Sequence, residues 1–156
     1  MKKLFIFLFI LLIISCSLES NKNKIGIVIH GGAGTILKEN MTPELENSYI
    51  IKLEEAVMAG YDILKNGGSS KDAVEQAIRV MEDSPLFNAG VGAVLTNDER
   101  VSLDASFMDG KNLNAGAIAG SSYIKNPISA AIAVMDKSPH VLLSSKGADD
   151  FAIEMG

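Results

Sequence analysis

The spacing of apolar residues changes about halfway along this chain of 156 residues. Between residues 43 and 81, apolar side chains recur three or four positions apart, which predicts amphipathic helices. Between residues 92 and 121, apolar and polar side chains alternate, which predicts strands with one buried face. The expected order of a strand, two helices, antiparallel strands and a helix favours an α+β fold in which helices pack on a sheet.

Capping signals predict where the helices begin and end. Thr42 before Pro43 is typical of a helix start, and Gly67 and Gly68 are expected to stop that helix. Residues 69–72 form a capping-box pattern that opens a second helix. The remaining expected elements are strands at 25–29, 92–96, 101–107, 113–121 and 141–144, helices at 126–136 and from 148, and a helix stop at Pro85.

The charge and the cysteine content exclude several classes of protein. The formal net charge is −5, which argues against a nucleic-acid-binding protein, because such a protein needs a basic surface. One cysteine excludes a disulfide within the chain, and with only two histidines it argues against a zinc site.

The first 24 residues differ from the rest of the chain. Two lysines precede an apolar run over residues 4–14, which is too short to span a bilayer as a helix and is typical of a secretory signal. The segment ending in Cys16 resembles the cleavage box of bacterial lipoprotein signals. We therefore expect a signal peptide at 1–15, a lipidated Cys16 with a flexible tether to residue 24, and anchoring in the bacterial cell envelope, periplasmic or outer-surface.

Two glycine-rich segments are candidates for a functional site. Residues 30–34 (HGGAG) follow an expected strand but fit neither a P-loop nor a dinucleotide-binding loop, so a tight structural turn is an equal alternative. Residues 84–93 contain few ionisable groups. That loop could present main-chain carbonyls to a monovalent cation or place one amide at a site, or it could be a buried connection that needs small residues.

The carboxylates between residues 98 and 109 offer no obvious catalytic pair. Asp98, Glu99 and Asp109 fall in expected turns, whereas Asp104 lies within an expected strand. An unpaired carboxylate in a strand is costly if buried, so we interpret Asp104 as a hydrogen-bonded structural residue rather than a catalytic one.

Five segments in order carry a resemblance to one family. They are residues 25–34, 82–96, 103–110, 114–120 and 125–143. Together they resemble the N-terminal part of the plant-type L-asparaginases, the isoaspartyl peptidases of the N-terminal-nucleophile hydrolases. Glycosylasparaginases, the alternative within the enzymes, share only the stretches after residue 101. A non-catalytic lipoprotein on the same scaffold is the alternative from another class.

The resemblance implies an αββα sandwich, made as a precursor that cleaves itself before a threonine. That threonine becomes an N-terminal nucleophile that hydrolyses asparagine or β-aspartyl dipeptides, with its own α-amine as the base. No threonine here stands in that context, since Thr35 follows the HGGAG turn, Thr42 caps a helix and Thr96 ends a strand. We therefore expect residues 25–156 to be the first-subunit part of a precursor, incomplete as a fold and inactive alone.

The resemblance also assigns site residues and partners. It implies a structural sodium ion and no other cofactor, with Gly31, Gly32 and Asn88 lining or supporting the nucleophile's surroundings. The expected partners are the second subunit from the same precursor and a second αβ unit in a homodimer. The main-chain carbonyls implied to bind sodium are those of Met81, Glu82, Ser84, Phe87, Ala89 and Val91.

Overall fold

The computed structural model describes residues 24–34 and 37–156. The expected signal peptide, Cys16 and Thr35 lie outside the described residues.

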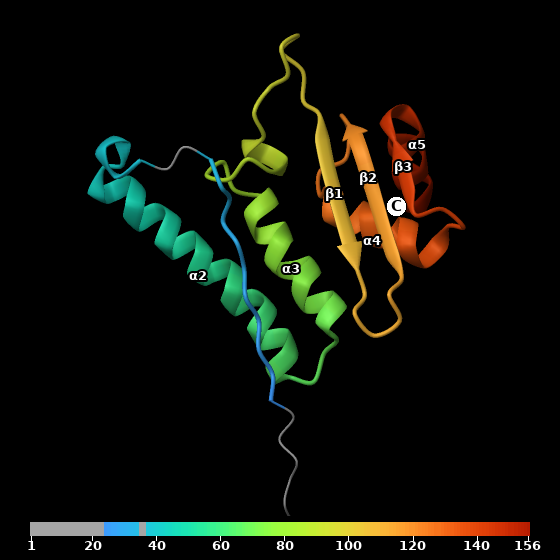
Figure 1. The fold of residues 1–156 in the computed structure, drawn as a ribbon, viewed down its shortest axis with the longest axis horizontal. Helices are drawn as coiled ribbons and strands as arrows, with labels where there is room; N and C mark the ends of the chain where they lie inside the picture. Colours follow the sequence, from blue (N-terminus) through green and yellow to red (C-terminus); the bar gives the residue numbers. More distant parts are fainter. Residues whose placement is uncertain (1–23, 35–36) are drawn as a thin grey trace, which may run out of the picture.

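Two helices form the first part of the described chain (Figure 1). Helix α2 spans Pro43–Lys65, and its start is fixed by the Thr42 hydroxyl, which accepts a hydrogen bond from the Leu45 N–H (3.2 Å). Helix α3 spans Ser70–Glu82, and Ser69 caps it in the same way. Both predicted starts are confirmed. A short 3₁₀ turn, η1, precedes α2 at Lys38–Asn40.

A three-stranded sheet follows, in the order β1-β2-β3. Strand β1 (Leu103–Met108) pairs antiparallel with β2 (Ala115–Ser121), and β3 (Leu142–Ser144) pairs parallel with β2. The pairing is irregular near Asp104, where a bulge in β2 brings Gly120 to a φ of +65°. A bulge of this kind needs a residue that tolerates a positive φ, which glycine does.

The core lies between the sheet and the last two helices, α4 (Pro127–Lys137) and α5 (Ser145–Met155). Ile118 of β2 packs there with Ala130 and Val134 of α4 and Ala148 of α5, all at most 6% exposed. Gly116 lets α4 approach β2 closely, because a side chain there would overlap the Ala131 carbonyl oxygen. Figure 1 shows α2 and α3 as a separate pair on the side of the sheet away from α5.

The predicted α+β class is therefore confirmed. Within residues 24–34 and 37–156, the sheet β1-β2-β3 and the helices packed on it are one part of the implied αββα sandwich. None of the helices in this described part of the chain combines the length and apolarity needed to cross a bilayer.

The predicted strand at 25–29 is wrong. This segment is extended and runs beside α2 and α3 (Figure 1), with no strand pairing to it among the described residues. Ile27 touches α2 at Gly60, yet Val28 is 95% exposed. The apolar run therefore gives an extended backbone without the sheet that was expected to bury it.

The predicted strand at 92–96 is also wrong. The chain makes a 3₁₀ turn, η2, at Gly90–Gly92, and the Val94 N–H then bonds the Asn88 side chain. Thr96 closes the 97–100 turn instead, since its hydroxyl accepts from the Arg100 N–H (3.1 Å). Alternating apolar residues fail to form a strand here because their backbone groups are already paired locally.

The remaining boundaries shift by a few residues. Helix α3 ends at Glu82 rather than at Pro85, because the Ser84 N–H turns back to the Met81 carbonyl (3.1 Å). Helix α5 begins at Ser145, three residues before the predicted start.

Candidate functional site

Most of the predicted site residues lie between the last turn of α3 and the start of η2. We call residues 81–91 the 81–91 loop. It is anchored by side chains that point inward. Ser84 is 3% exposed, and its hydroxyl accepts a hydrogen bond from the Leu86 N–H (3.3 Å). Phe87 is 5% exposed and meets Tyr49 of α2 edge to face, with ring centroids 5.9 Å apart. Two helices thus hold a loop that has little regular structure of its own.

Two glycines allow this loop to close on itself. Gly90 has a φ of +51°, and a side chain there would overlap the Glu82 carbonyl oxygen. A side chain at Gly92 would overlap the Phe87 carbonyl oxygen and lie 2.8 Å from that of Pro85. The main chain therefore packs against its own carbonyls at positions where only hydrogen atoms fit.

These close approaches involve two of the oxygens implied to bind sodium. Glu82 and Phe87 are two of the six predicted carbonyl ligands, and each oxygen lies directly against a glycine, where a side chain would not fit. The Phe87 carbonyl also accepts the Ala89 N–H (2.8 Å), which leaves it a second lone pair. In the described part of the chain, no cluster of three or more His, Cys, Asp or Glu side chains is arranged to hold a metal. The donors that this loop offers are main-chain oxygens, and the sodium site itself stays a prediction.

Asn88 lies at the edge of a small hollow of about 220 Å³. Its Oδ1 accepts a hydrogen bond from the Val94 N–H (2.9 Å), which fixes the plane of the amide. Residues 88–90 form one wall of the hollow, residues 102–104 at the start of β1 form another, and Pro127 closes it. The hollow thus brings Asn88, the predicted supporting amide, together with the start of β1.

Glu82 places a buried carboxyl group at this hollow. It is 3% exposed, and its two oxygens accept hydrogen bonds from the Ile128 N–H (3.0 Å) and the Asn126 amide (3.2 Å). Burial raises the pKa of Glu82 to about 7, although both hydrogen bonds act to lower it. The Asn126 amide also bonds Asp83 (3.1 Å), and together with Lys125 it lowers the pKa of Asp83. The described residues leave no buried side-chain polar atom unpaired.

Sequence reasoning missed the Glu82 side chain. Asn126 was expected to cap α4, but its side chain makes no capping bond, and Glu82 accepts from the start of α4 instead. The two partners are 46 residues apart, so no local pattern indicates the contact.

The HGGAG turn reaches the same region through Gly31. A methyl group added there would lie 3.0 Å from Leu53 of α2 and 3.6 Å from the Phe87 ring. Gly32 has a φ of +122°, and its N–H bonds His30 Nδ1 (3.2 Å). The structure thus brings Gly31 and the 81–91 loop together at Phe87.

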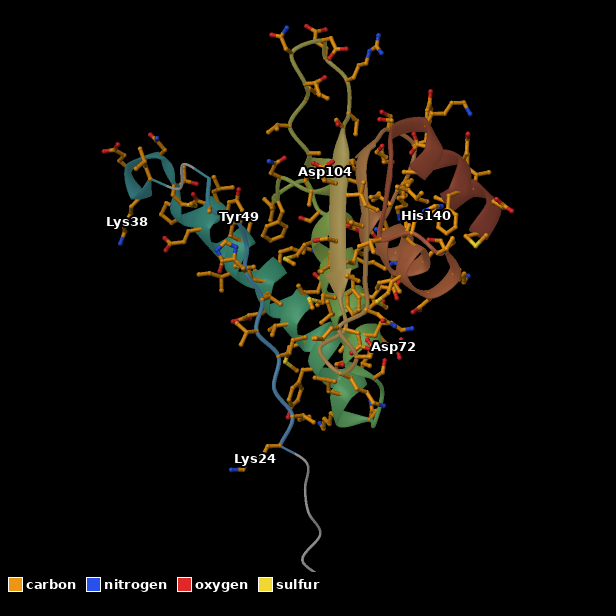
Figure 2. All side chains as sticks on the ribbon, turned by 45° about the vertical axis from the view of Figure 1, so that its right-hand side comes forward. Lys24, Lys38, Tyr49, Asp72, Asp104 and His140 are labelled. Carbon is orange, nitrogen blue, oxygen red and sulfur yellow. The ribbon has the colours of Figure 1, made fainter. Side chains whose placement is uncertain are left out.

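Asp104 is hydrogen-bonded, as predicted, and its structural rather than catalytic role stays a prediction. Its Oδ1 accepts from the Gly120 N–H (2.8 Å), the group that the bulge removes from the ladder. Figure 2 shows Asp104 on β1 and His140 well apart from it, toward the last helices. Of the three threonines considered, Thr42 and Thr96 are used in a cap and a turn.

Comparison with known proteins agrees with this arrangement. The family model described as Asparaginase matches residues 23–156, which is most of the chain. This chain belongs to the asparaginase family. It is 49% identical over 134 residues to an isoaspartyl peptidase of Salmonella typhimurium and 53% identical over 132 residues to a plant-type L-asparaginase of Pyrococcus abyssi. It is also 48% identical over 130 residues to an isoaspartyl peptidase of Escherichia coli.

The alignments cover different shares of the two partners. They include 86%, 85% and 83% of this chain but only 43%, 42% and 40% of the respective relatives. The chain therefore spans about two fifths of the length of these family members.

Proposed function

We propose that the full-length protein is an isoaspartyl peptidase and L-asparaginase that hydrolyses β-aspartyl dipeptides and the side-chain amide of asparagine. The observation that carries the proposal is the identity of about half of all aligned residues to relatives with those names. The aligned part includes the 81–91 loop and the hollow beside Asn88.

The proposed chemistry divides between this chain and a nucleophile outside it. A threonine freed by self-cleavage beyond residue 156 attacks the amide carbon, with its α-amine as the base. The C–N bond then breaks, ammonia or the amine of the second amino acid leaves, and water hydrolyses the aspartyl ester to free the threonine. The residues described here support that site. Asn88 is the amide at the hollow, oriented by the Val94 N–H, so that its Nδ2 can donate to the nucleophile or its surroundings. Gly31 and Gly32 form the turn beside Phe87.

Substrate assays on the full-length protein test this proposal. We expect release of aspartate from a β-aspartyl dipeptide and of ammonia from asparagine, and no turnover by residues 1–156 alone. Hydrolysis of a glycosylated asparagine with neither of the other activities would favour the glycosylasparaginase alternative. Absence of all three would favour the non-catalytic scaffold, and turnover by residues 1–156 would contradict the external nucleophile.

A structural sodium ion is a second part of the proposal. Main-chain oxygens of the 81–91 loop would hold it, and its contribution would be to stabilise the loop electrostatically. Replacement of sodium by tetramethylammonium at constant ionic strength is expected to lower the melting temperature of the full-length protein. An unchanged melting temperature would support the alternative of a buried connection without an ion.

The cellular location and assembly complete the proposal. Lipidation at Cys16 would anchor the protein in the bacterial cell envelope, and the mature form would pair αβ units into a homodimer. Cys16→Ser is expected to move the protein from the membrane fraction to the soluble fraction. Retention of the variant in membranes would contradict the anchor, and light scattering of the matured protein reports its assembly.

A further inference from the structure

Glu82 binds two parts of the molecule at once, one through its main chain and one through its side chain. Its carbonyl oxygen lies directly against Gly90 in the 81–91 loop. Its carboxylate accepts the Ile128 N–H at 3.0 Å and the Asn126 amide at 3.2 Å, both at the start of α4. A single residue thus connects the loop that carries Asn88 to the helix that packs under the sheet.

The contact with α4 has a specific electrostatic reason. Pro127 is the first residue of α4 and has no N–H, so the Ile128 N–H is the first donor that this helix offers. No side chain caps α4 locally. A carboxylate from α3 therefore satisfies that donor and also lies at the positive end of the helix dipole, where a negative charge is stabilised.

The same contact determines the shape of the hollow beside Asn88. Glu82, Asn88 and Pro127 all line it. If the carboxylate no longer held α4, the wall formed by Pro127 and the wall formed by the loop would be free to move apart. The Val94 N–H, which bonds Asn88, would then lose a defined partner.

We propose that the Glu82 side chain is a positioning residue, which holds the 81–91 loop against α4 and thereby places the Asn88 amide for hydrolysis. The claim that Glu82 assists hydrolysis rests on the proposed function. The claim that Glu82 positions the loop rests on the contacts of Glu82 alone.

The chain offers a matched control in Glu75. This residue lies on the same helix, and its carboxylate accepts a hydrogen bond from Ser129 of α4 (2.6 Å). Loss of Glu75 removes a polar contact between α3 and α4 but leaves the 81–91 loop untouched. Comparison of the two sites separates positioning of the loop from general docking of the helices.

Amide hydrogen exchange on the full-length protein tests the claim that Glu82 positions the loop. In Glu82→Ala, the protection of the Val94 amide is expected to fall about tenfold or more, because the variant loses two hydrogen bonds of a buried group. Glu82→Gln keeps an acceptor for Ile128 and is expected to restore most of that protection, while Glu75→Ala leaves it unchanged. If Glu82→Ala does not fold, Asn126→Ala is compared with Glu75→Ala in the same way.

Several results would overturn the inference. These are unchanged Val94 protection in Glu82→Ala, an equal loss in Glu75→Ala, or no recovery in Glu82→Gln. If the parent hydrolyses β-aspartyl dipeptides, Glu82→Ala is expected to lower kcat with little change in KM, and an effect on KM alone would contradict positioning of the reacting groups. If the parent hydrolyses nothing, the proposed function fails while the exchange data still decide the role of Glu82.

Discussion

The two glycine-rich segments, 30–34 and 88–92, look alike in the sequence but occupy different surroundings. In the second segment, side chains at Gly90 and Gly92 would overlap main-chain oxygens. In the first, a methyl group added at Gly32 or Gly34 would have no atom of another described residue within 4 Å, and the nearest atoms to one at Gly31 would be the end of Leu53 and the edge of the Phe87 ring. In residues 88–92, glycine is thus required because a side chain would not fit. In residues 30–34, glycine is required for its backbone conformation at most.

This difference arises from what each segment packs against. Residues 88–92 fold back on the end of α3 and pack against main-chain oxygens, of which that of Phe87 also accepts the Ala89 N–H. Residues 30–34 lie at the end of an extended and largely exposed segment. Counting glycines therefore says little about a turn until its neighbours are known.

The largest expected effect is at Gly92. Gly92→Ala forces a methyl group onto the Phe87 and Pro85 carbonyls, and overpacking of this kind costs about 3 kcal/mol. A clear fall in the melting temperature of the full-length protein is expected. A variant as stable as the parent would show that the loop can open without cost, and the contrast with residues 30–34 would disappear.

A smaller effect is expected at Asn88. Asn88→Ala removes the acceptor of the Val94 N–H, and loss of such a bond costs about 1 kcal/mol. Chemical denaturation measures this difference. Because the proposed function also uses the amide, activity should fall by more than the change in stability explains, and a proportional loss of both would reduce Asn88 to a structural residue.

At Gly32 the expected cost comes from the backbone alone. Its φ of +122° is a conformation that other residues adopt only with strain, and the site has open space around it. We expect Gly32→Ala to cost about 1 kcal/mol, the lower end for backbone strain, and so to destabilise the protein less than Gly92→Ala. Chemical denaturation of the two variants compares them. An equal loss in both would mean that the HGGAG turn is packed as tightly as the 81–91 loop.

The smallest effect is expected at Gly34. This residue has no described neighbour within reach of an added methyl group and no positive φ, so Gly34→Ala should change the free energy of unfolding by no more than about 0.5 kcal/mol. The same denaturation measurement checks it. Strong destabilisation by Gly34→Ala would show that another part of the protein packs against residues 30–34.

The helices were predictable because their signals are local. Thr42 and Ser69 each cap the helix that follows within three residues, and both starts agree with the structure. The 97–100 turn was also predicted from nearby residues. Each of these features depends on groups close in the chain. The hydrogen bond of Asp104 reaches Gly120 on the neighbouring strand, so only its need for a partner was predicted.

The failures depend on which partner each backbone or side-chain group finds. Residues 25–29 have the composition of a buried strand, but a strand also needs a neighbour, which composition cannot supply. Residues 92–96 alternate correctly, yet the nearby Asn88 side chain and Arg100 carbonyl already bind the backbone N–H groups of Val94 and Thr96. The predicted loop was placed correctly, whereas the carboxylate beneath it was overlooked because its partners lie beyond residue 125.

The bulge opposite Asp104 also acts as a change of phase within β2. The inward residues of this strand are Gly116 and Ile118, so regular alternation would turn residue 120 inward and residue 121 outward. The extra residue shifts that phase, and Ser121 faces the interior, where its hydroxyl donates to the buried Asp149 of α5. If residues 119–121 kept the regular alternation, with no bulge at Gly120, this serine would point to the other face of the sheet. One irregular residue in β2 thus decides whether the last helix has its polar attachment to the sheet.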